Sequence, residues 1–125
     1  MIKVNISTED MLSVLDLMDR LPVDREENVE RLNHTLRHGH LLLLKEDGEV
    51  KGCAELFRVK RVPAYPVLPW PKDDPKGKFV YCFSAVTEKN RIRDLINLAK
   101  VRFSECKKII WHTEKRNHKL NFERI

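Results

Sequence analysis

Apolar and polar positions repeat with recognisable periods along most of the chain. Apolar and polar residues alternate over residues 2–6, which predicts a short first strand. Residues 7–10 then supply hydroxyl caps and early acidic side chains, and apolar residues follow at helical spacing. A helix is therefore expected to begin there and to end near Pro22, because a proline disfavours helical geometry in the residue before it.

The next segment predicts a second helix and a β-hairpin. Apolar residues lie three and four apart within residues 26–38, and Gly39 stands where a left-handed C-terminal cap is expected. An apolar run of strand length follows over residues 40–45. The Asp-Gly pair at 47–48 is a strong turn signal, and residues 50–59 form the expected returning strand.

Residues 60–77 form a proline-rich segment with little prospect of regular structure. A loop this long in a small domain either has a function or contacts a partner. Tyr65 and Trp70 lie between the prolines. The segment therefore has two interpretations: a polyproline ligand, or a stiff crossover whose aromatic side chains pack onto the core. The second is favoured.

The remaining chain predicts a strand, a helix and a parallel strand. Residues 79–86 are apolar on both faces, as in a central strand, and residues 92–103 carry the longest helical stripe. Residues 108–113 predict the next strand, joined by a right-handed crossover. Alternation over residues 120–125 predicts a last short strand. The fold class is therefore α/β, a mixed sheet with flanking helices.

Length and composition favour one cytoplasmic domain over residues 1–125. The 125 residues are 42% hydrophobic and 34% charged, as in ordinary globular proteins. We expect no membrane span and no signal peptide. Cys53, Cys82 and Cys106 are odd in number and lie in apolar segments, which indicates buried free thiols rather than disulfides or a metal site.

The net charge of +5 is unevenly distributed along the chain. Residues 1–56 carry 7 Lys/Arg against 12 Asp/Glu, a balance of −5, whereas residues 57–125 carry 17 against 7, a balance of +10. A basic half of this kind favours a polyanionic partner, either a nucleic acid or a phosphate-bearing cofactor. The structural alternative is a solvated helix face and a solubilising tail.

The order of elements, and above all the hairpin HLLLLKEDGEVKGCAELFRV, resembles the GNAT (Gcn5-related) N-acetyltransferase superfamily. The resemblance covers nearly the whole chain and implies a mixed central sheet with flanking helices. It also implies that acetyl-coenzyme A docks where two central strands splay apart, here residues 78–86 and 108–113. An amine would be the acyl acceptor.

The resemblance assigns the cofactor-binding residues to the end of one strand and the loop after it. They are Ser84, Ala85, Val86, Asn90, Arg91, Ile92 and Arg93. Family members have glycines in this loop, because glycine lets backbone amides approach the pyrophosphate. The segment here has no glycine, so Arg91 and Arg93 are the groups expected to supply charge to the phosphates.

Catalytic groups are fewer than the family pattern implies. Family members commonly end with a helix and a Tyr that protonates the leaving thiolate, and the C-terminal segment here has no Tyr. The candidates for a general base are Glu55 and His112, each with the alternative of an ordinary structural residue. His34, His38 and His40 form a further cluster, interpreted as a surface histidine group rather than a metal site.

Two functions from different classes follow. The first is an N-acyltransferase or acetyl-CoA-binding protein acting on an amine. The second is a non-enzymatic GNAT-fold protein, of the kind found in bacteriophages, with a structural or interaction role in the virion or host cytoplasm. It would bind nucleic acid or an acidic protein through its basic C-terminal half, with an affinity that falls steeply with salt.

Overall fold

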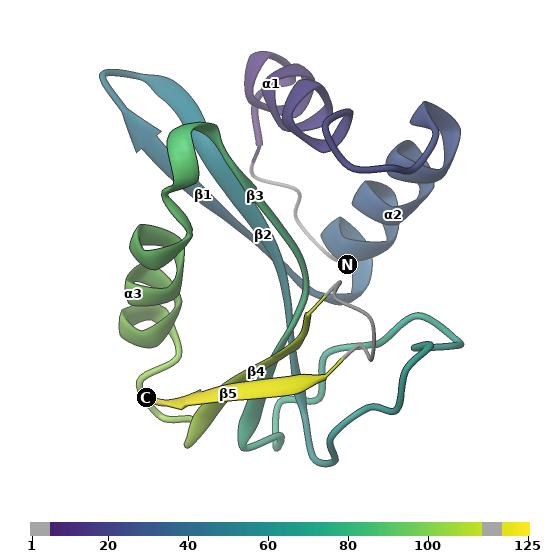
Figure 1. Ribbon diagram of the computed structural model, residues 1–125, viewed down its shortest axis with the longest axis vertical. Coiled ribbons are helices and arrows are strands. Elements are labelled where there is room, and N and C mark those ends of the chain that lie inside the picture. The colour runs from purple at the N-terminus through teal and green to yellow at the C-terminus, as the bar shows by residue number, and fades with distance from the viewer. Residues whose placement is uncertain (1–5, 114–118) are drawn as a thin grey trace.

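A computed structural model describes residues 6–113 and 119–125 (Figure 1). The elements in chain order are α1 (Thr8–Met18), α2 (Arg25–His38), β1 (His40–Glu46), β2 (Glu49–Val59), β3 (Phe79–Thr87), the short turn η1 (Glu88–Asn90), α3 (Ile92–Arg102), β4 (Lys108–His112) and β5 (Leu120–Arg124). The strands form one mixed five-stranded sheet in the order β1-β2-β3-β4-β5. The α/β class, the mixed sheet and the proline-rich crossover without regular structure are confirmed.

The two strand pairings predicted from the sequence are both present: the antiparallel hairpin β1–β2 and the parallel pair β3–β4. All neighbouring strands are antiparallel except β3 and β4, which are parallel and joined through α3. In the β1–β2 hairpin, Asp47 and Gly48 have φ of 52° and 80°. Two successive left-handed residues match the twist of the flanking strands, which explains the Asp-Gly pair. The predicted hairpin is therefore confirmed.

The helices cover both faces of the sheet (Figure 1). On one face, Leu56 and Val80 pack against Leu95, Ala99 and the residues that follow α3. On the other face, Cys53 and Val86 pack against apolar residues of α1 and α2. The sheet is thus covered on both sides, as the apolar character of both faces of β3 predicted. Among the described residues, none of the helices has the length and apolar character that a membrane span requires.

The ends of the helices agree in part with the predictions. The Ser7 side chain accepts a hydrogen bond from the backbone N–H of Asp10, as expected for an N-cap. Helix α1 ends at Met18, several residues before Pro22. Ile6 lies outside any strand and packs on the core, whereas the rest of the predicted first strand lies outside the described residues.

The left-handed cap predicted at Gly39 is wrong. Gly39 has φ of −147°, an extended backbone that any residue adopts. A lack of room for a side chain explains the glycine instead, because a Cβ atom there would lie 2.6 Å from Cδ2 and 2.8 Å from Cζ of the buried Phe57. The glycine therefore lets the chain pass close to Phe57 as it enters β1.

The sheet opens between β3 and β4. Their parallel register runs from Phe79–Lys108 to Cys82–Trp111 and stops there. On the other side of β3, the register with β2 shifts between Glu55 and Leu56, so Phe83 is an extra residue in β3. Such a bulge bends a strand and increases its twist. Beyond Cys82, β3 therefore follows β2 away from β4.

Candidate functional site

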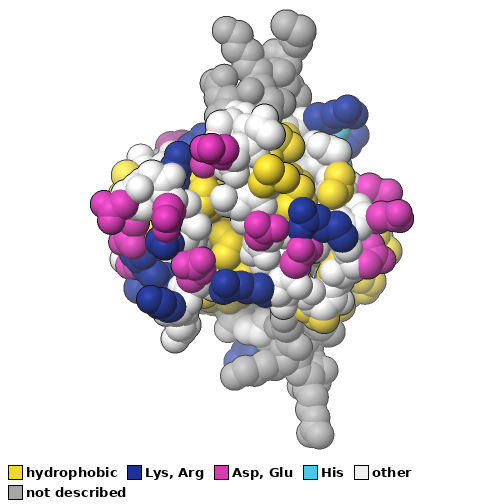
Figure 2. Space-filling view, turned by 90° about the horizontal axis from the view of Figure 1, so that it is seen from above, with side chains coloured by type: hydrophobic (Ala, Val, Ile, Leu, Met, Phe, Trp, Pro, Cys, Tyr) yellow, Lys and Arg dark blue, Asp and Glu magenta, His cyan; other side chains and the backbone are white. Residues whose placement is uncertain are grey.

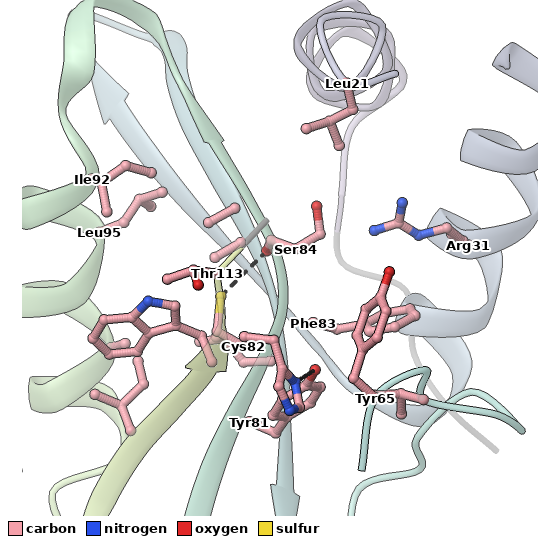
Figure 3. Close-up of a pocket in the computed structure, with 18 of the residues that line it drawn as sticks. Leu21, Arg31, Tyr65, Tyr81, Cys82, Phe83, Ser84, Ile92, Leu95 and Thr113 are labelled. Atoms are coloured by element: carbon pink, nitrogen blue, oxygen red, sulfur yellow. Dashed lines mark hydrogen bonds between the residues drawn. The ribbon is translucent and has the colours of Figure 1, made fainter. Parts of the chain in front are cut away.

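A cavity of about 640 Å³ occupies the space where β3 and β4 separate (Figure 3). It passes from the α3 face of the sheet to the face covered by α1 and α2. A space of this size matches that of ordinary small-molecule sites. The divergence of the two strands therefore produces a candidate binding site at the centre of the molecule.

The half of the cavity on the α3 side is apolar. Its walls belong to or pack on the α3-side core: Leu56, Cys82, Ala85, Leu95, Ile109 and Trp111. The Cys82 side chain donates a weak hydrogen bond to the backbone oxygen of Ser84 (Sγ···O 3.5 Å). Burial raises the pKa of the Cys82 thiol to about 12, so this sulfur stays protonated at neutral pH. This half of the cavity therefore suits an uncharged part of a ligand.

The half on the α2 side is aromatic and polar. Its walls come from α2, β3, β4 and the proline-rich crossover: Arg31, Tyr65, Trp70, Tyr81, Phe83 and His112. Trp70 lies edge-on to His34, with ring centroids 5.4 Å apart, and also contacts Phe83. Trp70 thus packs inward, as favoured from the sequence for the aromatic side chains of the crossover, whereas Tyr65 is 53% exposed; both line part of the cavity wall.

Arg31 and Glu55 form a buried ion pair beside the cavity. The Nη2 of Arg31 donates to Oε1 of Glu55 at 3.0 Å, and the hydroxyl of Thr35 donates to Oε2. The Glu55 carboxylate is 2% exposed, and its burial raises its pKa against the opposing effects of Arg31 and Thr35. Arg31 lines the cavity and Glu55 lies behind it. Glu55 therefore positions Arg31 rather than facing a ligand.

His112 and Tyr81 meet in the wall of the cavity. The Tyr81 hydroxyl lies 2.8 Å from Nδ1 of His112, and the ring of Tyr65 lies 5.7 Å from the imidazole. Burial raises the pKa of Tyr81 to about 12, so its hydroxyl keeps its proton at neutral pH. His112 thus lies in the cavity with its ring oriented by a neutral phenol.

Solved structures share this architecture. The chain matches an aminoglycoside 6'-N-acetyltransferase, AAC(6')-IG from Acinetobacter haemolyticus, with a TM-score of 0.62 and 13% identity, covering 90% of this chain and 79% of that one. It also matches the GNAT-like decarboxylase GphF, solved with isobutyryl-CoA, with a TM-score of 0.60 and 15% identity over 90% of this chain. The chain has the GNAT fold. No protein-family model matches the sequence, and the comparison with curated proteins gives no significant match.

The likeness is one of architecture. The chain spans 65% of the length of the decarboxylase chain, and identities of 13–15% establish the GNAT fold alone. The predicted resemblance to the GNAT superfamily is confirmed at that level. The activity, the acyl donor and the acceptor must consequently be argued from the residues of the site and not from the fold.

The residues assigned to the cofactor in the GNAT resemblance divide into two groups. Ser84, Ala85 and Ile92 line the cavity. Val86 faces the opposite side of the sheet and packs with the α1 and α2 core, and the Asn90 side chain is exposed. The structure thus brings the end of β3 and the start of α3 together at the cavity. The role of these residues in binding stays a prediction.

The two arginines of the GNAT loop are held by carboxylates. Arg91 pairs with Glu46 of the β1–β2 hairpin and with Asp94, whose Oδ2 lies 2.9 Å from Nε. Arg93 pairs with Glu123 of β5 at 2.7 Å. A phosphate would therefore have to share these guanidinium groups with carboxylates. The sequence gave no sign of the pairs with Glu46 and Glu123, because those two carboxylates lie on distant segments, whereas Asp94 is only three residues from Arg91.

The basic C-terminal half has mixed charge around it. Lys100 also pairs with Glu123, at 3.0 Å. On the face shown in Figure 2, acidic and basic side chains lie interspersed around a central strip of hydrophobic ones. Nucleic-acid binding through this half stays a prediction, and its residues Lys115 and Arg116 lie outside the described part of the chain.

Cysteines and histidines offer no further reactive centre in the residues that the structure describes. The three cysteines are free, with Cys53 and Cys106 buried and Cys82 partly buried. His34 stacks near His38 and shares a hydrogen bond with the Pro71 carbonyl, whereas His40 lies beside Asp73. No group of three or more potential ligands that could hold a metal occurs among the residues at 6–113 and 119–125.

Arg31 is the site residue that sequence reasoning missed. A signal for it exists: Asn28, Arg31 and Thr35 are polar residues spaced as one helix face, and all three are buried. Glu55 in the middle of an apolar strand also required a buried partner. Neither signal shows that Arg31 pairs with Glu55, because only the folded structure brings α2 and β2 together.

Proposed function

We propose that this protein binds an acyl-coenzyme A in the cavity between β3 and β4 and transfers its acyl group to an amine. The observation that carries the proposal is the opening between two parallel central strands, lined by apolar side chains on one side and by titratable ones on the other. A GNAT-fold neighbour was solved with isobutyryl-CoA, which supports an acyl-CoA as the ligand.

The residues present fit a pantetheine arm. Beyond Cys82, β3 has no register partner on β4, so the backbone groups of residues 84–86 that face this side are not used by β4 and could pair with a ligand amide. Ile92 begins α3 at the cavity, and a helix N-terminus favours phosphate groups. Asn90, Arg91 and Arg93 surround that helix start and would add donors or charge. The bound thioester would supply an activated acyl group.

His112 is the better placed of the two predicted general bases. It lines the cavity, whereas Glu55 is separated from it by Arg31. The Tyr81 hydroxyl lies 2.8 Å from Nδ1 of His112, and an imidazole in the cavity wall can accept the proton of an attacking amine. Tyr81 then fixes the ring orientation, and Glu55 acts indirectly by holding Arg31.

Calorimetry with a matched pair of variants tests ligand binding. Ile92→Trp fills the cavity from the start of α3, whereas Val101→Trp places the same side chain on the same helix at a position that is 77% exposed. We expect acetyl-CoA or CoA to bind the wild type, the Ile92 variant to bind at least about tenfold more weakly, and the Val101 variant to bind normally. A wild type that gives neither heat nor a thermal shift with millimolar CoA would refute the proposal.

Turnover is tested separately from binding. Release of the CoA thiol in the presence of a panel of amines measures transfer. We expect His112→Gln to lower the turnover by about 100-fold or more with CoA affinity unchanged, since general-base catalysis contributes on that order. Equal turnover in wild type and variant would remove His112 from the chemistry while leaving the binding proposal standing.

A further inference from the structure

The guanidinium of Arg31 points into the α2-side half of the cavity (Figure 3). It does so although the residue is only 9% exposed, because α2 carries it on the face that packs against β2. A buried cation that borders a ligand-sized space is unusual, since desolvation of a charge is costly. The ion pair with Glu55 compensates for part of that cost.

The pairing of Arg31 is incomplete. Nη2 donates to Glu55, and the guanidinium carbon lies 4.9 Å from the centre of the Phe83 ring. Nε is buried and has no acceptor within hydrogen-bonding distance in the described part of the chain. A guanidinium has five N–H donors in a planar fork that matches a carboxylate. Arg31 therefore has N–H donor capacity that the described part of the chain does not use, on a guanidinium that borders the cavity.

The surroundings of Arg31 favour an anion attached to an apolar body. Aromatic rings of Tyr65, Trp70 and Phe83 line this half of the cavity, and beside such low-polarity walls a charge-assisted hydrogen bond is stronger than in water. Glu27 lines the cavity from an exposed position, and Glu55 is engaged behind Arg31. A bare cationic amine would meet the positive guanidinium at close range.

We propose that the α2-side half of the cavity recognises a carboxylate on one of the two substrates, and that Arg31 is the group that binds it. This inference rests on the proposed function, which places the acyl group and the acceptor in this cavity. The carboxylate has two sources. It belongs either to the acyl group, as in a dicarboxylic acyl-CoA, or to the acceptor, as in an α-amino acid.

Binding measurements with paired ligands distinguish the two sources. Succinyl-CoA against acetyl-CoA tests the acyl group, and phenylalanine against phenethylamine, each with and without CoA, tests the acceptor. We expect one carboxylate-bearing ligand to bind at least about tenfold more tightly than its neutral or decarboxylated counterpart, as for a charge-assisted bidentate pair. That preference identifies the substrate that carries the carboxylate.

Three variants test the role of Arg31. Arg31→Lys keeps the charge beside Glu55 but not the fork, and we expect it to remove most of the tenfold preference. Glu55→Gln removes the competing carboxylate with little change of shape, and we expect several-fold tighter binding of the carboxylate ligand. Arg37→Met, an exposed position on the same helix, should change nothing. Circular dichroism verifies that each variant is folded.

The outcomes separate this inference from the proposed function. If CoA binds but neither carboxylate ligand is preferred, or the preference survives in the Arg31 variant, the carboxylate proposal is wrong and acyl-CoA binding stands. If CoA does not bind, phenylalanine titrated into the protein alone still decides the matter. Tighter binding of phenylalanine than of phenethylamine that depends on Arg31 supports the inference. Equal binding of the two ligands overturns it.

Discussion

Gly39→Ala tests the structural role of the one glycine that the sequence misassigned. The backbone there is extended, so alanine meets no conformational strain, and it would restrict the unfolded chain, which alone stabilises by about 0.4–1 kcal/mol. The new Cβ, however, would lie 2.6 Å and 2.8 Å from two ring carbons of Phe57 and nearer still to Cε2. The steric clash and the entropy of the unfolded chain therefore predict opposite changes in the free energy of unfolding.

The clash should prevail because Phe57 has nowhere to move. Its side chain is 0% exposed, and its ring contacts those of His34 and Phe83 at centroid distances of 5.8 Å and 6.1 Å. Overpacking of a core costs about 1–3 kcal/mol. We expect Gly39→Ala to lower the free energy of unfolding by about 1–2 kcal/mol, or the melting temperature by about 4–8 °C.

A double-mutant cycle with Phe57→Leu isolates the clash. Urea unfolding of the four proteins should show that Gly39→Ala costs about 1 kcal/mol less in the Phe57→Leu background, because the ring carbons are gone. Gly48→Ala serves as the control: nothing lies within 4 Å of its Cβ position, and its cost comes from φ of 80°. That cost should be the same in both backgrounds. An unchanged cost of Gly39→Ala in the two backgrounds would refute the steric explanation.

Three further predictions concern charge and the cavity. Hydrogen bonds from Arg93 and Lys100 lower the pKa of Glu123 to about 2, so the stability that Glu123 contributes, up to about 1 kcal/mol, should be lost as the pH falls from 4.5 to 2. Urea unfolding of the wild type and of Glu123→Gln at pH 7 and pH 3 measures this, and the variant should lack this part of the loss. The raised pKa of Cys82, about 12, should slow its labelling by iodoacetamide at pH 8 at least about 100-fold in the folded relative to the unfolded protein, as measured by mass spectrometry. Rapid labelling of the folded protein would contradict the raised pKa. Tyr81→Phe removes the hydroxyl 2.8 Å from Nδ1 of His112, and we expect lower turnover with unchanged CoA affinity in calorimetry. Normal turnover would show that the phenol does not orient the base.

Local signals in the sequence were sufficient for most of the fold. The Asp-Gly pair at 47–48, the Ser7 cap and the apolar runs of β1 to β3 each depend on neighbours a few residues away, and each was predicted. The parallel pairing of β3 with β4 followed from the helix between them. These features are written into short segments, so a single sequence reveals them.

The parts that failed depend on contacts between distant segments. Gly39 was predicted as a left-handed cap from its position after a helix. The residue is a glycine because Phe57 of β2 leaves no room for a side chain there. Glu55 was considered as a base because nothing in the sequence shows that Arg31 and Thr35 enclose it. His112 could be placed at the end of a strand, but its approach to Tyr81 could not. Site chemistry is thus set by the packing of α2 and the crossover against the sheet.

The loop after β3 has left-handed backbone geometry without any glycine. The GNAT resemblance predicts glycines there, and the chain instead has Lys89 and Asn90 with φ of 52° and 56°. Left-handed geometry costs about 1 kcal/mol or more for a residue such as Lys89 and persists only where the surroundings impose it, whereas asparagine adopts it more readily. The surroundings here are the Thr87 hydroxyl, which accepts the N–H of Arg91 at 2.9 Å, and the ion pair of Arg91 with Glu46. Arg91 therefore holds the turn at the start of α3 through its side chain and its backbone. A role for it in binding phosphate would compete with that structural one, so the phosphates of a bound acyl-CoA would rely more on the backbone of the turn than on the Arg91 charge.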